Sequence, residues 1–128
     1  MFDMVRILYA LDRIEEAILL ILEKTELIHS PNDFSMSTDG MFTLSGVCMQ
    51  LIFIGENVKV IDNKTNHSYL SSYPNIPWIE IMGLRDIIAH EYHRIDAEEI
   101  FQIIKNDLPD LLSVVQQMKH DLKKSYNL

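Results

Sequence analysis

The sequence predicts an all-α fold, an up-and-down four-helix-type bundle whose last helix is kinked or split. Two long segments repeat apolar residues at steps of three and four, the period of a helix that buries one face. Glycine and proline number only four each among 128 residues, so long helices are not interrupted. No segment shows a convincing strand pattern, and helices with short connections predict a bundle.

The first helix is expected over residues 3–28 and the second over about 41–62. The stretch between them, from residue 30 to Gly40, is rich in Ser, Asn, Asp and Thr, which predicts a loop. Within the second helix Gly55 costs about 1 kcal/mol relative to alanine. We expect the compensation to be the close approach of a neighbouring helix.

The third helix is expected from Trp78 to about His93, with Pro77 suited to its first turn. Before it, residues 63–75 are polar and predict a loop with at most a short helical turn. Trp78 and Tyr73 are expected to wedge this loop against the bundle.

The last helix is expected to start at Ala97, because Asp96 followed by Glu99 resembles a capping box. Pro109, in the sequence Asp-Leu-Pro, should break or kink this helix, since proline lacks an N–H and clashes with the preceding turn. The apolar pattern then continues to about Lys124.

Length and composition predict a single domain over residues 1–128. The net charge of −8 argues against a broad nucleic-acid-binding surface and suits a partner with a basic face. Cys48 is the only cysteine, so no disulfide can form within the chain, and a reducing, cytoplasmic setting fits. The N-terminus lacks the layout of a signal peptide, and the longest apolar run, residues 17–22, is too short to span a membrane.

The most informative segment runs from Arg85 to Tyr92. Arg85 can hold a phosphate with two hydrogen bonds, and His90 can move a proton near neutral pH. Five residues on an ideal helix turn roughly 500°, so Arg85 and His90 point about 140° apart. They could converge if the helix loosens near His90, or if a second subunit supplies the matching residues across a two-fold axis. Asp86, four residues before His90, could orient the imidazole.

Ordinary structural roles compete with this interpretation. Arg85 could be a surface ion-pair partner of Glu80 or Asp86, His90 a hydrogen-bonded residue near a helix end, and Tyr92 a packing residue. Glu56, beside Gly55, is either a solvated helix residue or a polar group aimed at the site, and its spacing does not decide between them.

Metal and thiol chemistry are weaker candidates. His90 and His93 stand three residues apart, whereas the zinc-protease signature needs its histidines at i and i+4, and no third ligand is evident. Cys48 lies on the apolar stripe of the second helix, where a buried structural thiol is expected rather than a nucleophile. We therefore expect neither a metal nor another cofactor.

Several short motifs in the same order resemble one known family. The spacing Arg85-x4-His90-x-Tyr92 resembles the RX4HXY motif of HepT-like toxins, within the HEPN superfamily of small helical domains. Residues 51–59 (LIFIGENVK) are similar to the family's IGEAVK helix, and residues 73–78 (YPNIPW) to its YPEIPW segment. Residues 82–86 (MGLRD) are similar to its GMRN segment, with Leu84 in place of methionine. Residues 107–109 resemble its DLP break, and His93-Arg94 departs from the Phe-Gly that many members carry.

The resemblance implies a homodimeric helical bundle that acts as a metal-independent ribonuclease and as the toxin of a type VII-like toxin–antitoxin pair. The implied partner is a minimal nucleotidyltransferase antitoxin, which in characterised members transfers AMP to the motif tyrosine, here Tyr92. The family's arginine and histidine correspond to Arg85 and His90, and the residue after the arginine corresponds to Asp86. The RNA substrate supplies its own nucleophile, the 2′-hydroxyl.

Two other hypotheses remain open from the sequence. The chain could be a non-catalytic helical module that binds a nucleotide or a partner, which the acidic charge favours slightly. It could also serve chiefly as the substrate of a nucleotidyltransferase.

Overall fold

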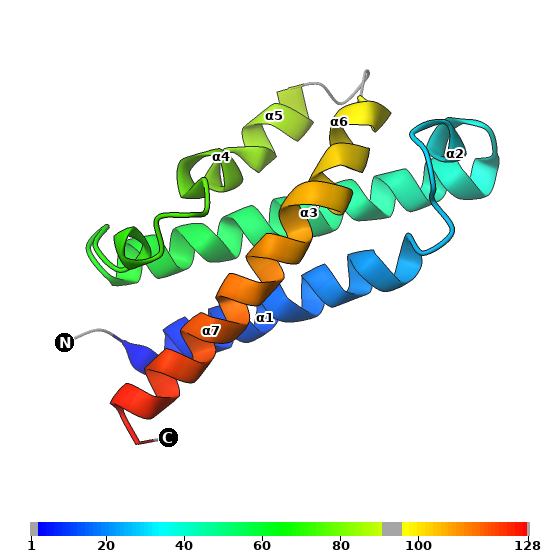
Figure 1. Cartoon of the computed structure of the whole chain (residues 1–128). Helices are drawn as coiled ribbons and strands as arrows, with labels where there is room; N and C mark the ends of the chain where they lie inside the picture. The colour runs from blue at the N-terminus through cyan, green and yellow to red at the C-terminus, as the bar shows by residue number, and fades with distance from the viewer. Residues whose placement is uncertain (1–2, 91–95, 128) are drawn as a thin grey trace.

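The computed structural model describes residues 3–90 and 96–127, and in these ranges the regular structure is helical (Figure 1). Its elements are α1 (Met4–Lys24), α2 (Asn32–Ser35), α3 (Thr38–Lys64), the 3₁₀ turn η1 (Leu70–Ser72), α4 (Trp78–Met82), α5 (Leu84–His90), α6 (Ala97–Gln102), the π-helical turn η3 (Ile103–Asp107) and α7 (Leu108–Ser125).

Four rods run alternately up and down the bundle: α1, α3, the pair α4–α5, and the continuous but bent rod α6–η3–α7. Figure 1 shows α3 between α1 and the α4–α5 pair, with the last rod crossing over α3 and α1. The first residues of α1 and the last turn of α7 lie at the same end of the bundle (Figure 1). The predicted fold class, including the bent last helix, is confirmed.

The core is built from the inner faces of α1, α3 and α7. Fully buried side chains recur at helical spacing along each of them, including Ile7, Leu11, Ile14 and Ile18 on α1, Leu51, Ile54, Val58 and Ile61 on α3, and Val115 and Met118 on α7. Each such side chain contributes roughly 1.5–3 kcal/mol of transfer free energy. At the rim, the Lys119 ammonium of α7 contacts Asp12 at 2.6 Å and Glu15 at 2.8 Å, which links α7 to α1.

The expected loop over residues 30–40 is wrong in part, because it contains α2 and the first turn of α3. Ser37 is the N-cap of α3, and its hydroxyl accepts a hydrogen bond from the Gly40 N–H at 2.9 Å. Phe34 of α2 is fully buried and anchors the segment to the bundle. Ser, Asp and Asn favour both loops and helix starts, so composition alone did not separate the two.

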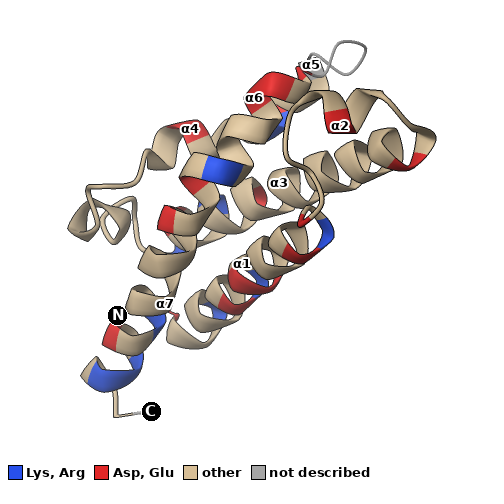
Figure 2. Ribbon diagram, turned by 45° about the vertical axis from the view of Figure 1, so that its right-hand side comes forward, with Lys and Arg blue, Asp and Glu red and all other residues tan. Residues whose placement is uncertain are grey.

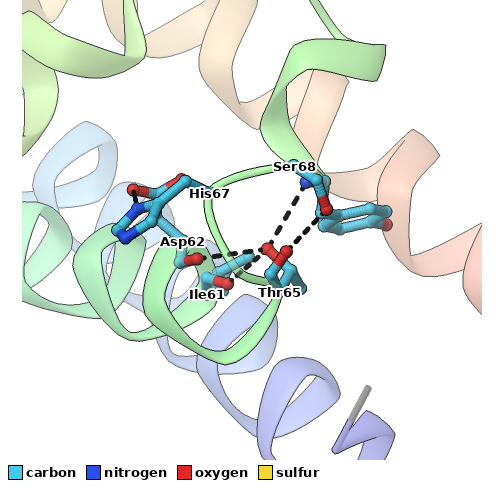
Figure 3. Close-up of polar contacts among 6 residues, drawn as sticks. Ile61, Asp62, Thr65, His67 and Ser68 are labelled. Atoms are coloured by element: carbon cyan, nitrogen blue, oxygen red, sulfur yellow. Dashed lines mark hydrogen bonds and ion pairs between the residues drawn. The ribbon is translucent and has the colours of Figure 1, made fainter. Parts of the chain in front are cut away.

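The end of α3 is closed by side chains rather than by a glycine (Figure 3). The Thr65 hydroxyl donates to the Ile61 carbonyl oxygen at 2.9 Å, and the His67 backbone N–H donates to the Asp62 carbonyl oxygen at 2.8 Å. Asn66 and His67 both adopt positive φ, 53° and 62°, a conformation that costs most residues energy. A contact of 2.7 Å between the His67 ring and the Asp62 carboxylate helps to hold the turn.

The third rod is two helices rather than the single helix expected from Trp78 to His93. Gly83 lies between α4 and α5, although its N–H still bonds the Ile79 and Glu80 carbonyl oxygens at 3.1 Å. Trp78 is buried, and its indole N–H donates to the Tyr73 carbonyl oxygen at 2.9 Å, so these two residues hold the preceding loop as predicted. Residues 91–93, the expected end of this helix, lie outside the described residues.

The last rod begins and bends where the sequence indicates. The Asp96 carboxylate accepts hydrogen bonds from the Glu98 N–H at 3.0 Å and the Glu99 N–H at 3.3 Å, which caps α6. The π-helical turn η3 comes just before Pro109, whose ring would clash with the Lys105 carbonyl of a regular α-helix. The kink predicted from the Asp-Leu-Pro sequence therefore takes the form of a π turn.

Among the described helices, α3 is long and apolar enough to cross a membrane by length and composition, with a mean hydropathy of 1.4 over its best window. A core helix passes the same test, and 39% of that window is buried inside the bundle. The inner face of α3 packs in the core. Part of its outer face is apolar and exposed, and is described below.

Gly55 of α3 lies directly under the backbone of α4, and this contact yields a matched test. A Cβ atom at Gly55 would stand 2.6 Å from the Ile81 carbonyl oxygen, whereas a Cβ at Gly46 of the same helix would meet nothing within 4 Å. We predict that Gly55→Ala lowers the free energy of unfolding by about 1–3 kcal/mol, because overpacking outweighs the gain in helix propensity.

Gly46→Ala is the control, and it should raise the free energy of unfolding by up to about 1 kcal/mol through helix propensity alone. Urea unfolding followed by circular dichroism measures both variants. Equal stabilisation by the two substitutions would show that α4 does not depend on the close approach at Gly55.

Candidate functional site

Arg85 of α5 faces Glu56 of α3, and this contact is the centre of the candidate site. The guanidinium Nη1 lies 3.6 Å from the Glu56 Oε1, while 62% of the Arg85 side chain remains exposed. The contact is possible because Gly55, the residue before Glu56, lets the α4–α5 pair approach α3 closely. An exposed pair of this kind contributes little stability, so its value lies in where it holds the guanidinium.

The Glu56 carboxylate lies between two cations. Its Oε1 is 3.6 Å from Arg85 Nη1 and 3.7 Å from the Lys59 Nζ, and both distances exceed a hydrogen bond. This oxygen atom is itself buried and has no hydrogen-bond donor among the described residues. Among the described residues Arg85 pairs with Glu56 rather than with Glu80 or Asp86.

Lys59 is a residue of this cluster that the sequence reasoning did not single out. Its position three residues after Glu56 on one helix was the available signal, because residues at i and i+3 are neighbours on a helix surface. Arg85 and Lys59 together give the site two cations in a chain whose net charge is −8.

The backbone of α5 is helical from Leu84 through His90. Residues five apart on such a helix leave its axis in directions about 140° apart. Between Leu84 and His90 the backbone therefore shows no loosening, and the residues directly after His90 lie outside those described. The His90 side chain, Tyr92 and His93 lie outside what the structure describes, and Asp86 is exposed on α5.

The outer face of α3 carries an exposed apolar stripe, defined here as Phe42, Met49, Phe53 and Val60. These side chains are 82%, 63%, 42% and 39% exposed, and their spacing of seven, four and seven residues places them along one line of the helix. Residues 41–55 include no charged residue, so Figure 2 shows this length of α3 without blue or red. Glu56 borders the stripe, three residues after Phe53 and four before Val60.

The other candidate groups do not join this cluster. Among the described residues, no three His, Cys, Asp or Glu side chains are placed to hold a metal ion. Cys48 is buried, and burial raises the pKa of its thiol to about 11. Such a thiol stays protonated at neutral pH, which agrees with the expected structural role.

Comparison with known proteins identifies the family. Residues 7–118 match the family described as "Ribonuclease HepT-like". A protein of Thermococcus cleftensis named "Probable ribonuclease HepT" is 32% identical over 109 residues, which cover 85% of this chain and 92% of that protein.

Two proteins of Methanocaldococcus jannaschii are also similar. "Putative RNase MJ1380" is 36% identical over 70 residues, or 55% of this chain and 61% of that protein. "Gamma-glutamylcyclotransferase and putative RNase MJ0434" is 29% identical over 113 residues, or 84% of this chain and 48% of that protein. The chain thus spans less than two thirds of the length of these two relatives.

No solved structure is significantly similar to this chain. The family match nevertheless covers α1 to most of α7, including α3 with Glu56 and α5 with Arg85 and His90. The chain therefore belongs to the HepT-like ribonuclease family.

Proposed function

We propose that this protein is the toxin of a type VII-like toxin–antitoxin pair and that it cleaves RNA without a metal ion. In this proposal Arg85 and His90 act in a cleft shared by two subunits, and the protein works in the cytoplasm. The observation that carries the proposal is the Arg85–Glu56 contact beside an exposed apolar stripe, in a chain of the HepT-like ribonuclease family.

Cleavage would proceed by transesterification within the RNA. His90 would take the proton of the 2′-hydroxyl, whose oxygen forms a new bond to phosphorus, while the bond from phosphorus to the 5′-oxygen breaks. Water would act as the second acid and give a proton to the departing 5′-oxygen. The products are a 2′,3′-cyclic phosphate and a 5′-hydroxyl, and no outside nucleophile is consumed.

The cations would stabilise charge on the phosphate. Arg85 can donate two parallel hydrogen bonds to phosphate oxygens, and Lys59 adds a second positive charge nearby. Glu56 would act as a positioning residue, since its carboxylate holds the exposed guanidinium against α3 when no RNA is present. Asp86 remains a candidate for orienting the imidazole from one helical turn away.

The geometry of α5 and α3 supports the proposed second subunit. A regular helix directs Arg85 and His90 apart, so a joint site calls for groups from another chain. The stripe from Phe42 to Val60 is roughly 27 Å long and is apolar, as the centre of a two-fold interface requires. Because Glu56 borders the stripe, a two-fold axis through it would bring both copies of the Arg85–Glu56 pair to one cleft.

Control by the partner is the last element of the proposal. A minimal nucleotidyltransferase antitoxin would attach AMP to Tyr92, two residues after His90. The added phosphate would repel the substrate phosphate, and the nucleoside would fill the cleft.

We predict that purified protein cleaves labelled RNA in excess EDTA and that Arg85→Ala and His90→Ala each reduce the rate by at least about 100-fold. Glu56→Gln should lower kcat by about tenfold, less than loss of the arginine, because it only frees the guanidinium. Arg6→Ala and His29→Ala change an exposed arginine and an exposed histidine elsewhere, and should leave the rate unchanged. A wild-type rate in either active-site variant, or 3′-hydroxyl ends, would contradict the mechanism.

The stripe makes a separate prediction about assembly. Phe53→Glu should convert the dimer to a monomer in sedimentation analysis, because it places a charge at the centre of an apolar interface. Tyr126→Glu is the matched control, since Tyr126 is an aromatic residue with the same 42% exposure at the end of α7. A dimer that survives Phe53→Glu, or a monomeric wild type, would remove the shared cleft.

The modification is tested by mass spectrometry after incubation with the proposed antitoxin and ATP. We expect a mass increase of one or more AMP groups on Tyr92, its loss in Tyr92→Phe, and inhibited RNA cleavage by the modified protein. Modification without inhibition would support the alternative in which the chain is mainly a substrate. Absence of any cleavage, with a nucleotide or a partner protein still bound, would support the non-catalytic binding module, which the acidic charge favours slightly.

A further inference from the structure

A groove of about 580 Å³ lies on the side of α5 away from α3's outer stripe, between the α4–α5 pair and the α6–η3–α7 rod. Its apolar lining comes from three rods: Leu51 and Ile54 of α3, Ile81 and Leu84 of the α4–α5 pair, and Ile103 of η3. Such a volume admits several side chains at once. The groove is distinct from the candidate site, because neither Arg85 nor Glu56 lines it.

The rim of the groove is acidic. Glu80 of α4, Glu99 of α6, Asp107 of η3 and Asp110 of α7 all line it, and none of them forms an ion pair with a lysine, arginine or histidine among the described residues. Figure 2 shows acidic positions on α4 and α6. Partial burial, with repulsion from Asp110 and Glu80, raises the pKa of Asp107 above its usual range. The rim therefore carries negative charge that the described part of the chain leaves uncompensated.

Two of the four rim carboxylates, Asp107 and Asp110, lie at the bend in the last rod. The π turn before Pro109 inserts one extra residue into the helix and so changes which side chains of η3 and α7 face the α4–α5 pair. It gives the groove Asp107 and Asp110 together with Ile103 and the buried Leu108 and Leu111. Apolar floor and charged rim thus alternate along one helical rod, as in grooves that accept an amphipathic helix.

We infer that this groove docks a cationic amphipathic segment of a partner protein, with apolar side chains on the floor and lysine or arginine along the rim. The negative charge of the rim favours this occupant over others. RNA would be repelled, and an acidic or neutral helix would leave the four rim carboxylates without a positive partner. The inference does not rest on the nuclease proposal, because Arg85 faces α3 and leaves the groove free.

The test uses a fluorescent synthetic helix of about 14 residues, built from Leu on one face and Lys on the other. Its binding to the full-length protein is measured by anisotropy at low and high salt. We expect saturable binding that weakens as salt rises. We expect no binding by a peptide of the same length with Glu in place of Lys, and weaker binding by a scrambled peptide that has no apolar face.

A charge-matched pair of variants locates the site. Glu80→Gln/Asp107→Asn/Asp110→Asn should weaken binding of the Leu–Lys peptide by at least about tenfold, while remaining folded by circular dichroism. Glu23→Gln/Glu26→Gln/Asp39→Asn removes the same charge from exposed residues elsewhere and should change binding by less than about twofold. Equal weakening in the two triple variants would overturn the inference, because it would show attraction by net charge alone.

Methyl NMR gives a second measurement, because non-specific electrostatic attraction would not change the chemical shifts of the methyl groups in the groove. The peptide should shift the isoleucine methyl signals of Ile81, Ile87 and Ile103, which line the groove, and leave Ile14 and Ile21 of the α1 core unchanged. Shifts confined to other surfaces would contradict the inference, as would complete displacement of the peptide by spermine at equal charge. Arg85→Ala should retain full peptide binding, so failure of the nuclease proposal leaves this result intact.

Discussion

The close approach of α4 to α3 at Gly55 is the constraint on which the rest of the site depends. A side chain at this position would meet the Ile81 carbonyl oxygen at 2.6 Å, so only a glycine lets the α4–α5 pair rest on α3 at this distance. That spacing puts Arg85 within 3.6 Å of Glu56. Without it, α5 would stand away from α3 and the guanidinium would have no fixed place.

The same constraint gives α5 two different sides. Arg85 faces Glu56 of α3 and borders the apolar stripe, whereas Leu84 and Ile87 line the groove under the bent last rod. One short helix thus separates a proposed catalytic cleft from a proposed docking groove. A partner bound in the groove would contact α5 on the side opposite Arg85. Its binding would therefore be able to shift α5 and change the position of the Arg85 guanidinium.

The fold was largely predictable because its signals are local. Apolar spacing located α1, α3 and α7. Asp96 indicated the start of α6, and Pro109 indicated the bend in the last rod. The split at Gly83 and the early start of α3 at Thr38 were missed, because they depend on packing against α3 and on a cap whose residue types also suit loops. Of the candidate site, residue chemistry and spacing singled out Arg85 and His90, and the resemblance strengthened that interpretation. That Glu56 and Lys59 lie beside Arg85 needed the structure, since no spacing shows which side of α3 meets α5.

Mixed dimers test whether Arg85 and His90 act together across two subunits. Arg85→Ala and His90→Ala chains, carrying different tags, would be co-expressed, and the heterodimers isolated by both tags. If each site takes Arg85 from one subunit and His90 from the other, every heterodimer regains one intact site of two, or about half of the wild-type rate. If both residues act from the same chain, the heterodimer has no intact site and stays as inactive as either parent, which would contradict the account.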